Sequence, residues 1–138
     1  GGMGSISTLE KPLTLRELLA RVTETLHLSW VTYTGELDMP LRRIAVLGGS
    51  GGRFIEKELV SLDVDCIITG DVGYHAWTLA SMYSRTVIDA GHFGTERLFL
   101  NFLEGEITDF LTKSDEKDDI QIVIASEENP VHLYSRGT

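Results

Sequence analysis

Three short apolar runs, each followed by a glycine and then by a helical segment, occupy the middle of the chain. The runs cover residues 43–47, 65–69 and 86–89, and we expect helices over residues 54–62, 72–83 and 92–111. Alternation of short strands with helices is typical of α/β domains that have a mostly parallel sheet. Because each run is apolar throughout, we expect its strand to be buried on both faces.

The segment before these units predicts one more helix and one more strand. Thr14 and Glu17 have the spacing of a capping box, and apolar residues at helical spacing continue to about His27. Residues 30–33 then predict a strand. Residues 120–124 are a last strand candidate, although their alternation is weak.

The chain predicts a single domain. Its 138 residues have room for one core, and no sequence repeat recurs at a fixed period. We assign residues 1–10 to a linker or a remnant of cloning because they are rich in Gly and Ser. Residues 11–129 form the predicted α/β domain, and residues 130–138 form a C-terminal tail. Trp30, Trp77 and Phe99 fall on apolar faces and are expected in the core.

Composition excludes several classes of protein. The net charge of -9 argues against binding to a nucleic-acid polymer, which requires a basic patch. No apolar run approaches the roughly 18 to 20 residues that span a bilayer, so we expect no membrane segment. The single cysteine, Cys66, lies within an apolar run, so we expect a buried thiol in a reducing, cytoplasmic compartment.

His92 and Glu96 are the first candidates for chemistry. They are four residues apart at the start of a predicted helix, so their side chains leave one face of it. An imidazole nitrogen and a carboxylate that approach one point are typical of divalent metal sites. The alternative is structural: His92 packs at the helix start and Glu96 is a solvated carboxylate that the helix dipole favours.

Asp71 and His75 repeat this arrangement after the preceding strand. If the two strands are adjacent, both pairs face one cleft, and Asp71 and His75 then contact the substrate or orient the metal ligands. The alternative for Asp71 is an N-cap of its helix. Another candidate is the glycine-rich turn with Gly49, Ser50 and Gly51, which binds an anion or simply allows two backbones to approach closely.

Three segments together resemble one family: AVLGGSGG at residues 45–52, TGDVGYH at residues 69–75 and DAGHFGTE at residues 89–96. It is the NGG-one-interacting-factor-three-like family, whose members are also labelled GTP cyclohydrolase I type 2 homologues or dinuclear-metal-centre proteins. Residues 11–15 resemble the start of that family's second half. The resemblance covers residues 9–129, with the three motifs in the family's order and spacing.

The resemblance implies a fold and a metal site. The family fold duplicates an α-β-(βα)3 unit with helices on both faces of a mixed, mostly parallel sheet whose first strand is antiparallel to the rest. The predicted element order matches one such unit. Family members carry two divalent metals, and the second half supplies the His and Glu of a G-H-x-x-x-E motif, here His92 and Glu96. Zn, Mn, Fe and Mg all remain candidates for the metal.

The family's other ligands are absent from this chain. They include two adjacent histidines followed by a proline in the first half, and this sequence has no adjacent histidine pair. Either cloning removed the N-terminal half or the chain is a natural half-length relative. Because each metal requires about four to six donors, we expect weak binding unless a homo-oligomer or the missing N-terminal half adds ligands.

The resemblance leaves the function open between two classes. The first is a metal-dependent hydrolase with a small-molecule or nucleotide substrate, as the cyclohydrolase label implies, and we expect this half alone to be inactive. The alternative is a non-catalytic metal-binding scaffold or protein-interaction module. An independent anion-binding domain ranks last because it depends on the glycine turn alone.

Overall fold

The structure is a computed structural model that describes residues 4–113 and 120–137. The chain forms two compact units, Gly1–Glu96 and Arg97–Thr138. The elements in chain order are β1 (Ser5–Thr14), α1 (Leu15–Thr25), β2 (Thr32–Tyr33), β3 (Pro40–Ser50), α2 (Gly52–Glu58), β4 (Cys66–Gly70), α3 (Tyr74–Met82), β5 (Thr86–Asp89) and α4 (His92–Lys113).

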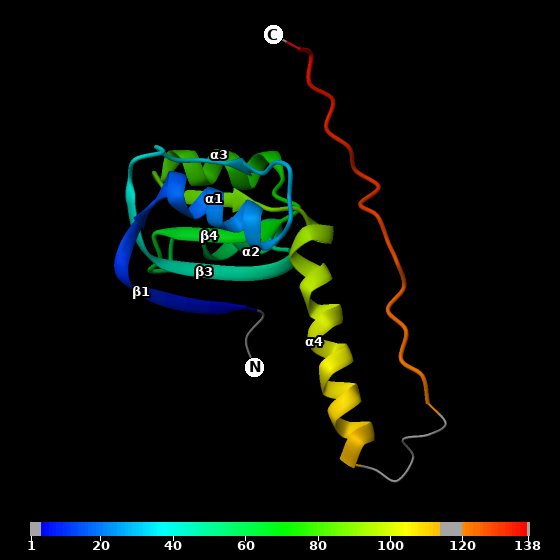
Figure 1. Cartoon of the computed structure of the whole chain (residues 1–138). Coiled ribbons are helices and arrows are strands. Elements are labelled where there is room, and N and C mark those ends of the chain that lie inside the picture. Colours follow the sequence, from blue (N-terminus) through cyan, green and yellow to red (C-terminus); the bar gives the residue numbers. More distant parts are fainter. Residues whose placement is uncertain (1–3, 114–119, 138) are drawn as a thin grey trace. The chain divides into compact units, whose positions relative to one another are not determined.

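The first unit is built on a five-stranded mixed sheet with the strand order β1-β3-β4-β5-β2. Figure 1 labels three of these strands, β1, β3 and β4. Strands β3, β4 and β5 are parallel, as the three apolar runs predict. Strand β2, which is the predicted strand over residues 30–33, pairs antiparallel with β5. The predicted mixed, mostly parallel α/β fold is therefore confirmed.

Strand β1 is an element that the sequence pattern does not predict. Residues 5–14 pair antiparallel with β3, so the expectation of a linker over residues 1–10 is wrong from Ser5 onward. Most β1 side chains are exposed, and backbone hydrogen bonds to β3 hold the strand at the sheet edge. An edge strand of this kind has no apolar period. The strand expected over residues 120–124 is also wrong, because those residues have no regular secondary structure.

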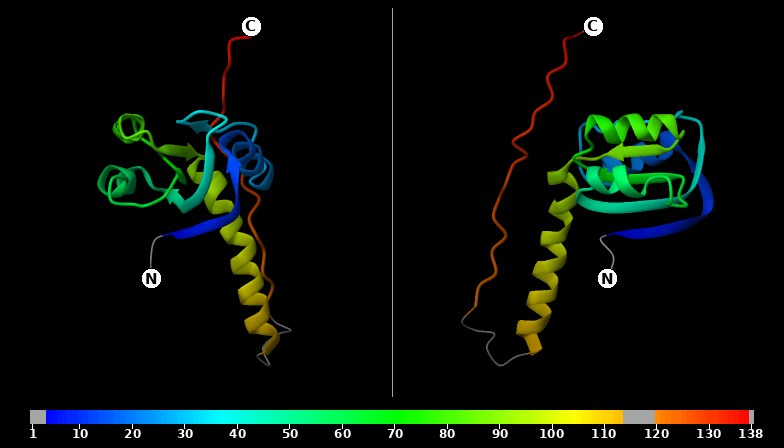
Figure 2. Two further views of the ribbon diagram at one scale, coloured as in Figure 1. Left: turned by 90° about the vertical axis from the view of Figure 1, so that its left-hand side faces the viewer. Right: turned by 180° about the vertical axis from the view of Figure 1, so that it is seen from behind.

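Helices lie on both faces of the sheet (Figure 2), and each face has its own hydrophobic layer. Helix α1 packs on one face, and α2 and α3 pack on the other. Neighbouring strand residues alternate between the layers: Cys66 and Ile68 lie with α1, whereas Ile67 lies with α2 and α3. The fully apolar runs are explained, because their strands are buried on both sides.

Of the side chains expected in the core, two are packed there and two are exposed. Cys66 is fully buried as expected, and burial raises the pKa of its thiol to about 12. Trp77 packs against the α2–α3 layer. The core assignments of Trp30 and Phe99 are wrong, because these residues are 38% and 58% exposed. In the described part of the chain, no helix is long and apolar enough to cross a membrane.

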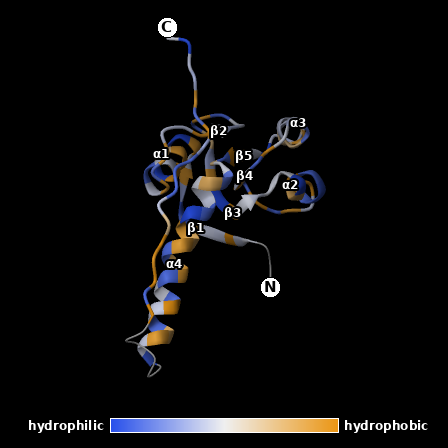
Figure 3. Cartoon of the chain, turned by 90° about the vertical axis from the view of Figure 1, so that its right-hand side faces the viewer, coloured by the Kyte–Doolittle hydropathy of each residue, from blue (hydrophilic) through white to orange (hydrophobic). Residues whose placement is uncertain are grey.

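The second unit contains α4 from Arg97 onward and the segment that follows it. Figure 3 shows apolar residues recurring along this helix between polar ones. Four of them are spaced by four, four and three residues, which places them on one side of the helix. These residues, which we call the α4 stripe, are all substantially exposed: Phe99, Leu103, Ile107 and Phe110.

Candidate functional site

The ends of β4 and β5 bring the candidate residues together. These strands are parallel neighbours with Thr69 opposite Asp89, so their carboxyl ends lie at the same edge of the sheet. The chain leaves β4 into Asp71 and leaves β5 into His92, the first residue of α4. The adjacency on which the predicted common site depended is therefore confirmed.

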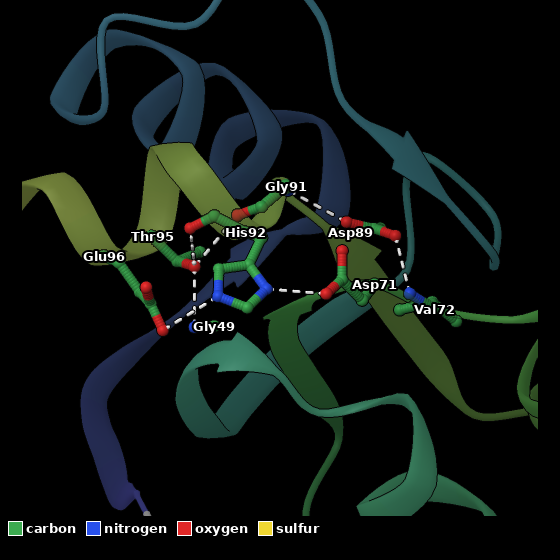
Figure 4. A network of polar contacts seen from close by, with 8 residues as sticks. All are labelled: Gly49, Asp71, Val72, Asp89, Gly91, His92, Thr95 and Glu96. Atoms are coloured by element: carbon green, nitrogen blue, oxygen red, sulfur yellow. Dashed lines mark hydrogen bonds and ion pairs between the residues drawn. The ribbon is translucent and has the colours of Figure 1, made fainter. Parts of the chain in front are cut away.

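His92 lies between two carboxylates (Figure 4). Its Nδ1 is 2.6 Å from Oδ2 of Asp71, and its Nε2 is 3.0 Å from Oε1 of Glu96. All three side chains are about half exposed, so ligands from solvent can reach them. Asp71 and Glu96 are 25 residues apart in the sequence and are joined here through one imidazole ring.

The two carboxylates favour the protonated ring of His92. The hydrogen bond to Asp71 is the main cause that raises the pKa of His92 above its ordinary value, and the charge of Glu96 adds to it. Desolvation opposes this shift in part. Because a metal that binds a ring nitrogen must displace its proton, this shift would oppose any binding of a metal by His92 in acid.

The residues present fit two ligands of one metal, and no more. Metal–nitrogen and metal–oxygen bonds of about 2.0 to 2.2 Å place neighbouring ligand atoms about 3.0 to 3.5 Å apart. The 3.0 Å between Nε2 of His92 and Oε1 of Glu96 falls in this range. Asp71 faces the opposite nitrogen, so it cannot reach the same point. Accordingly, among residues 4–113 and 120–137, no three His, Cys, Asp or Glu side chains form a metal-binding group.

Asp71 does not cap helix α3. The N-cap of α3 is Gly73, and no side chain caps that helix, so the N-cap alternative for Asp71 is wrong. Its carboxylate contacts His92 instead, as in metal sites where a carboxylate orients a histidine ligand. His75 lies in the first turn of α3, where its exposed ring meets the ring of Tyr74 edge-on. The metal-ligand and orienting roles of these residues stay predictions.

The glycine-rich segment is the end of a strand, and its amides have protein partners. Ser50 is the last residue of β3 and pairs with Gly70 of β4. The Gly49 N–H donates to Oγ1 of Thr95, and the Gly51 N–H donates to the carbonyl of Gly70. These contacts support the interpretation that the glycines allow two backbone segments to approach closely. Anion binding stays a prediction, with two of its amide donors already engaged.

Two polar residues of this network were not singled out from the sequence. Asp89 accepts hydrogen bonds from the backbone N–H groups of Val72 and Gly91, both at 2.9 Å. Thr95 accepts from the Gly49 N–H, and its hydroxyl also lies within hydrogen-bond distance of the Gly91 carbonyl. Both residues lie within the DAGHFGTE segment, so the signal was the motif itself, in which only His92 and Glu96 received roles.

Known proteins resemble this chain in sequence. Residues 1–130 match the family Duf34/NIF3 (NGG1p interacting factor 3). A "GTP cyclohydrolase 1 type 2 homolog" of Clostridium acetobutylicum is 44% identical over 95 residues, which cover 69% of this chain and 35% of the relative. The Bacillus subtilis protein of the same name is 28% identical over 130 residues, which cover 94% of this chain and 34% of the relative.

Solved structures resemble it in fold. Staphylococcus aureus protein SA1388 superimposes with a TM-score of 0.81 at 25% identity, over 96% of this chain and 42% of that one. A Bacillus cereus protein related to NIF3 gives a TM-score of 0.60 at 28% identity, over 76% of this chain and 31% of that one. The chain thus spans about a third of the length of the curated relatives it matches. On the family match, these relatives and the shared fold, the chain belongs to the Duf34/NIF3 family.

Proposed function

We propose that His92 and Glu96 are two ligands of a divalent metal site and that Asp71 orients His92 for this task. The observation that carries the proposal is the contact between the Asp71 carboxylate and Nδ1 of His92. A carboxylate in that position holds the proton on Nδ1. Nε2 is then the nitrogen left to bind the metal, together with Oε1 of Glu96, which lies 3.0 Å from it. An imidazole and a carboxylate suit Zn, Mn or Fe, and Mg remains a candidate for the carboxylate.

The remaining ligands come from outside this set of residues. Two protein donors fall short of the four to six that a tightly held divalent ion requires. We propose two sources: a second copy of this chain in a homo-oligomer, or the part of the longer family proteins that this chain does not cover. Either source brings further donors to the half-exposed His92–Glu96 pair.

The complete site would act as a metal-dependent hydrolase. A divalent metal supplies Lewis-acid polarisation of a substrate oxygen. The name "GTP cyclohydrolase 1 type 2 homolog" of the relatives supports a nucleotide or another small molecule as substrate. Within this chain, His92 and Glu96 hold the ion and Asp71 keeps the imidazole in one orientation. We expect no hydrolysis from the chain alone, because the site lacks the donors that fix the ion.

A non-catalytic interaction module is the second candidate. The α4 stripe supports it, because four large apolar side chains on one side of a helix are exposed. Exposed apolar patches of this kind mark surfaces that associate with other proteins. In this alternative the metal stabilises an assembly and meets no substrate. Closed coordination by protein atoms alone would favour the module, whereas an open position would favour the hydrolase.

Metal titration of the purified protein tests the proposal. We expect weak binding of Zn²⁺ or Mn²⁺ by isothermal titration calorimetry, and a loss of more than about tenfold in affinity in His92→Ala. His132→Ala is the matched control, because it removes a histidine outside the network, and it should bind as the unaltered chain does. Unchanged binding in His92→Ala would contradict the assignment. Adding the part of the longer family proteins that this chain does not cover, and repeating the titration, then separates the two ligand sources.

A further inference from the structure

We propose that Asp89 is the positioning residue of this site: its carboxylate ties the loop after β4 to the loop after β5 and thereby holds Asp71 against His92. Only the effect on metal affinity depends on the proposed function. The effect on the orientation of His92 does not, because it concerns the metal-free protein. Asp89 acts through its neighbours and has no assigned contact with a metal or substrate.

Asp89 contacts the neighbours in sequence of Asp71 and His92, the two residues whose side chains meet (Figure 4). Oδ2 accepts from the N–H of Val72, the residue after Asp71, at 2.9 Å. Oδ1 accepts from the N–H of Gly91, the residue before His92, also at 2.9 Å. One carboxylate therefore fixes the separation of the two loops whose side chains form the 2.6 Å contact.

The backbone of Asp71 requires such support. Asp71 has a φ of 54° and Gly91 a φ of 77°, so both lie in the left-handed region. For a residue with a side chain, this conformation persists only when its surroundings hold it in place. The hydrogen bond from Asp89 to the next amide along the chain is such a restraint for Asp71.

A carboxylate suits this position better than its isosteric amide. The two N–H groups approach two different oxygens, and aspartate has an acceptor for each. Asparagine has one acceptor oxygen, and its NH₂ group would face the second N–H donor. Asp89→Asn therefore keeps the shape of the side chain but releases one of the two loops.

The expected consequence is a change in the tautomer of neutral His92. In the unaltered protein the two carboxylates compete for the proton of the neutral ring, and Asp71, which is 2.6 Å from Nδ1 whereas Glu96 is 3.0 Å from Nε2, favours the proton on Nδ1. Release of one loop weakens this selection, so a larger fraction of the ring carries the proton on Nε2. Because Nε2 is the nitrogen proposed to bind the metal, its affinity falls as well.

The test compares Asp89→Asn with a control at the other end of β4, at the residue before Cys66. Asp65 also accepts two backbone N–H groups, those of Arg42 and Arg43, at 2.8 and 2.7 Å. Both N–H groups donate to the same oxygen, Oδ2, so Asp65→Asn removes the charge of a carboxylate but keeps one acceptor oxygen for both donors. Nitrogen-15 NMR of the ring nitrogens, at a pH where His92 is neutral, should show the Nε2–H form gaining in Asp89→Asn and unchanged in Asp65→Asn. Zn²⁺ affinity should fall about tenfold in Asp89→Asn only.

Two results would overturn the proposal. One is a His92 tautomer that is the same in Asp89→Asn as in the unaltered chain, and the other is an equal change in Asp65→Asn. If Asp89→Asn does not fold, hydrogen exchange on the unaltered protein decides, because the amides of Val72 and Gly91 must then be protected. Unprotected amides there would reject the proposal. A tautomer shift without any Zn²⁺ binding would support the role of Asp89 and reject the proposed metal site.

Discussion

Gly49 lies where a side chain would collide with the carboxylate of Glu96. Its φ is 69°, and a Cβ atom there would come within 2.3 Å of Oε1 of Glu96. Gly91 has a similar φ of 77°, but a Cβ there would meet no atom within 4 Å. An alanine at either position would strain the backbone, but only an alanine at Gly49 would also collide with Glu96.

Gly49→Ala and Gly91→Ala should destabilise the protein by similar amounts and differ at the site. Each places a side chain at a left-handed φ, which costs about 1 to 2 kcal/mol in the free energy of unfolding, measured with urea. Only Gly49→Ala displaces Glu96, so only there should the pKa of His92 fall part of the way toward its ordinary value. NMR titration of His92 measures this fall, and equal pKa values in both variants would contradict the placement of Glu96.

The pH dependence of this contact has a definite sign. The pKa of His92 is raised in the folded state, chiefly by Asp71. Its protonated ring therefore stabilises the fold below the unfolded pKa, and this contribution is lost as pH rises through the folded pKa. In Gly49→Ala, the part that depends on Glu96 is absent at every pH.

At the scale of single elements, the start of α1 shows how a local signal acts. Thr14 and Glu17 form the complete predicted capping box: Oγ1 of Thr14 accepts from the Glu17 N–H, and the Glu17 carboxylate accepts from the Thr14 N–H. The hydrogen bonds that the Glu17 carboxylate accepts from the Thr14 N–H and from the Thr14 hydroxyl lower the pKa of Glu17. The charged carboxylate therefore stabilises the helix at neutral pH, and this contribution is lost as pH falls through its folded pKa.

Thr14→Ala should lower the free energy of unfolding at pH 7 by about 1 kcal/mol, because it removes an N-cap. Thr78→Ala is the control, since the Thr78 hydroxyl donates to the Tyr74 carbonyl inside α3 and alanine is a good helix former there. Urea unfolding should show little or no loss in the control. Equal losses in both variants would mean that the cap contributes nothing specific. Glu17→Gln should flatten the acid side of the stability profile.

At the scale of the whole molecule, the α4 stripe is an exposed apolar surface within the described residues. Its residues Phe99, Leu103, Ile107 and Phe110 are exposed, and none belongs to either hydrophobic layer of the first unit. Burial of such side chains is favourable by about 25 cal/mol for each Å² of apolar surface removed from water. We therefore expect the chain, whose mass is 15.3 kDa, to associate with itself in solution.

Leu103→Glu should shift this association toward the monomer, because it places a charge in the middle of the stripe. Asn101→Glu adds the same charge two residues away, on a different side of α4, and should leave the assembly intact. Size-exclusion chromatography with light scattering measures the mass of each. A mass of 15.3 kDa for the unaltered chain at all concentrations would rule out the homo-oligomer as the source of further metal ligands.

The sequence alone was sufficient for the central part of the fold. The apolar runs predicted β3, β4 and β5 because burial on both faces leaves a continuous signal, and the capping box predicted where α1 begins. It was not sufficient for β1, whose exposed side chains leave no period, or for the segment at 120–124, whose apolar residues find no strand partner in the described chain. Pairing at a sheet edge depends on the neighbouring strand.

The candidate site divides in the same way. The placement of His92 and Glu96 on one helix face is a local property, so it could be predicted from their separation of four residues. The contact between Asp71 and His92 depends on the parallel pairing of β4 with β5 and on the tie through Asp89. The contacts of Asp71 with His92 and of Asp89 with Val72 join residues 21 and 17 positions apart, and only the folded sheet brings them within hydrogen-bond distance.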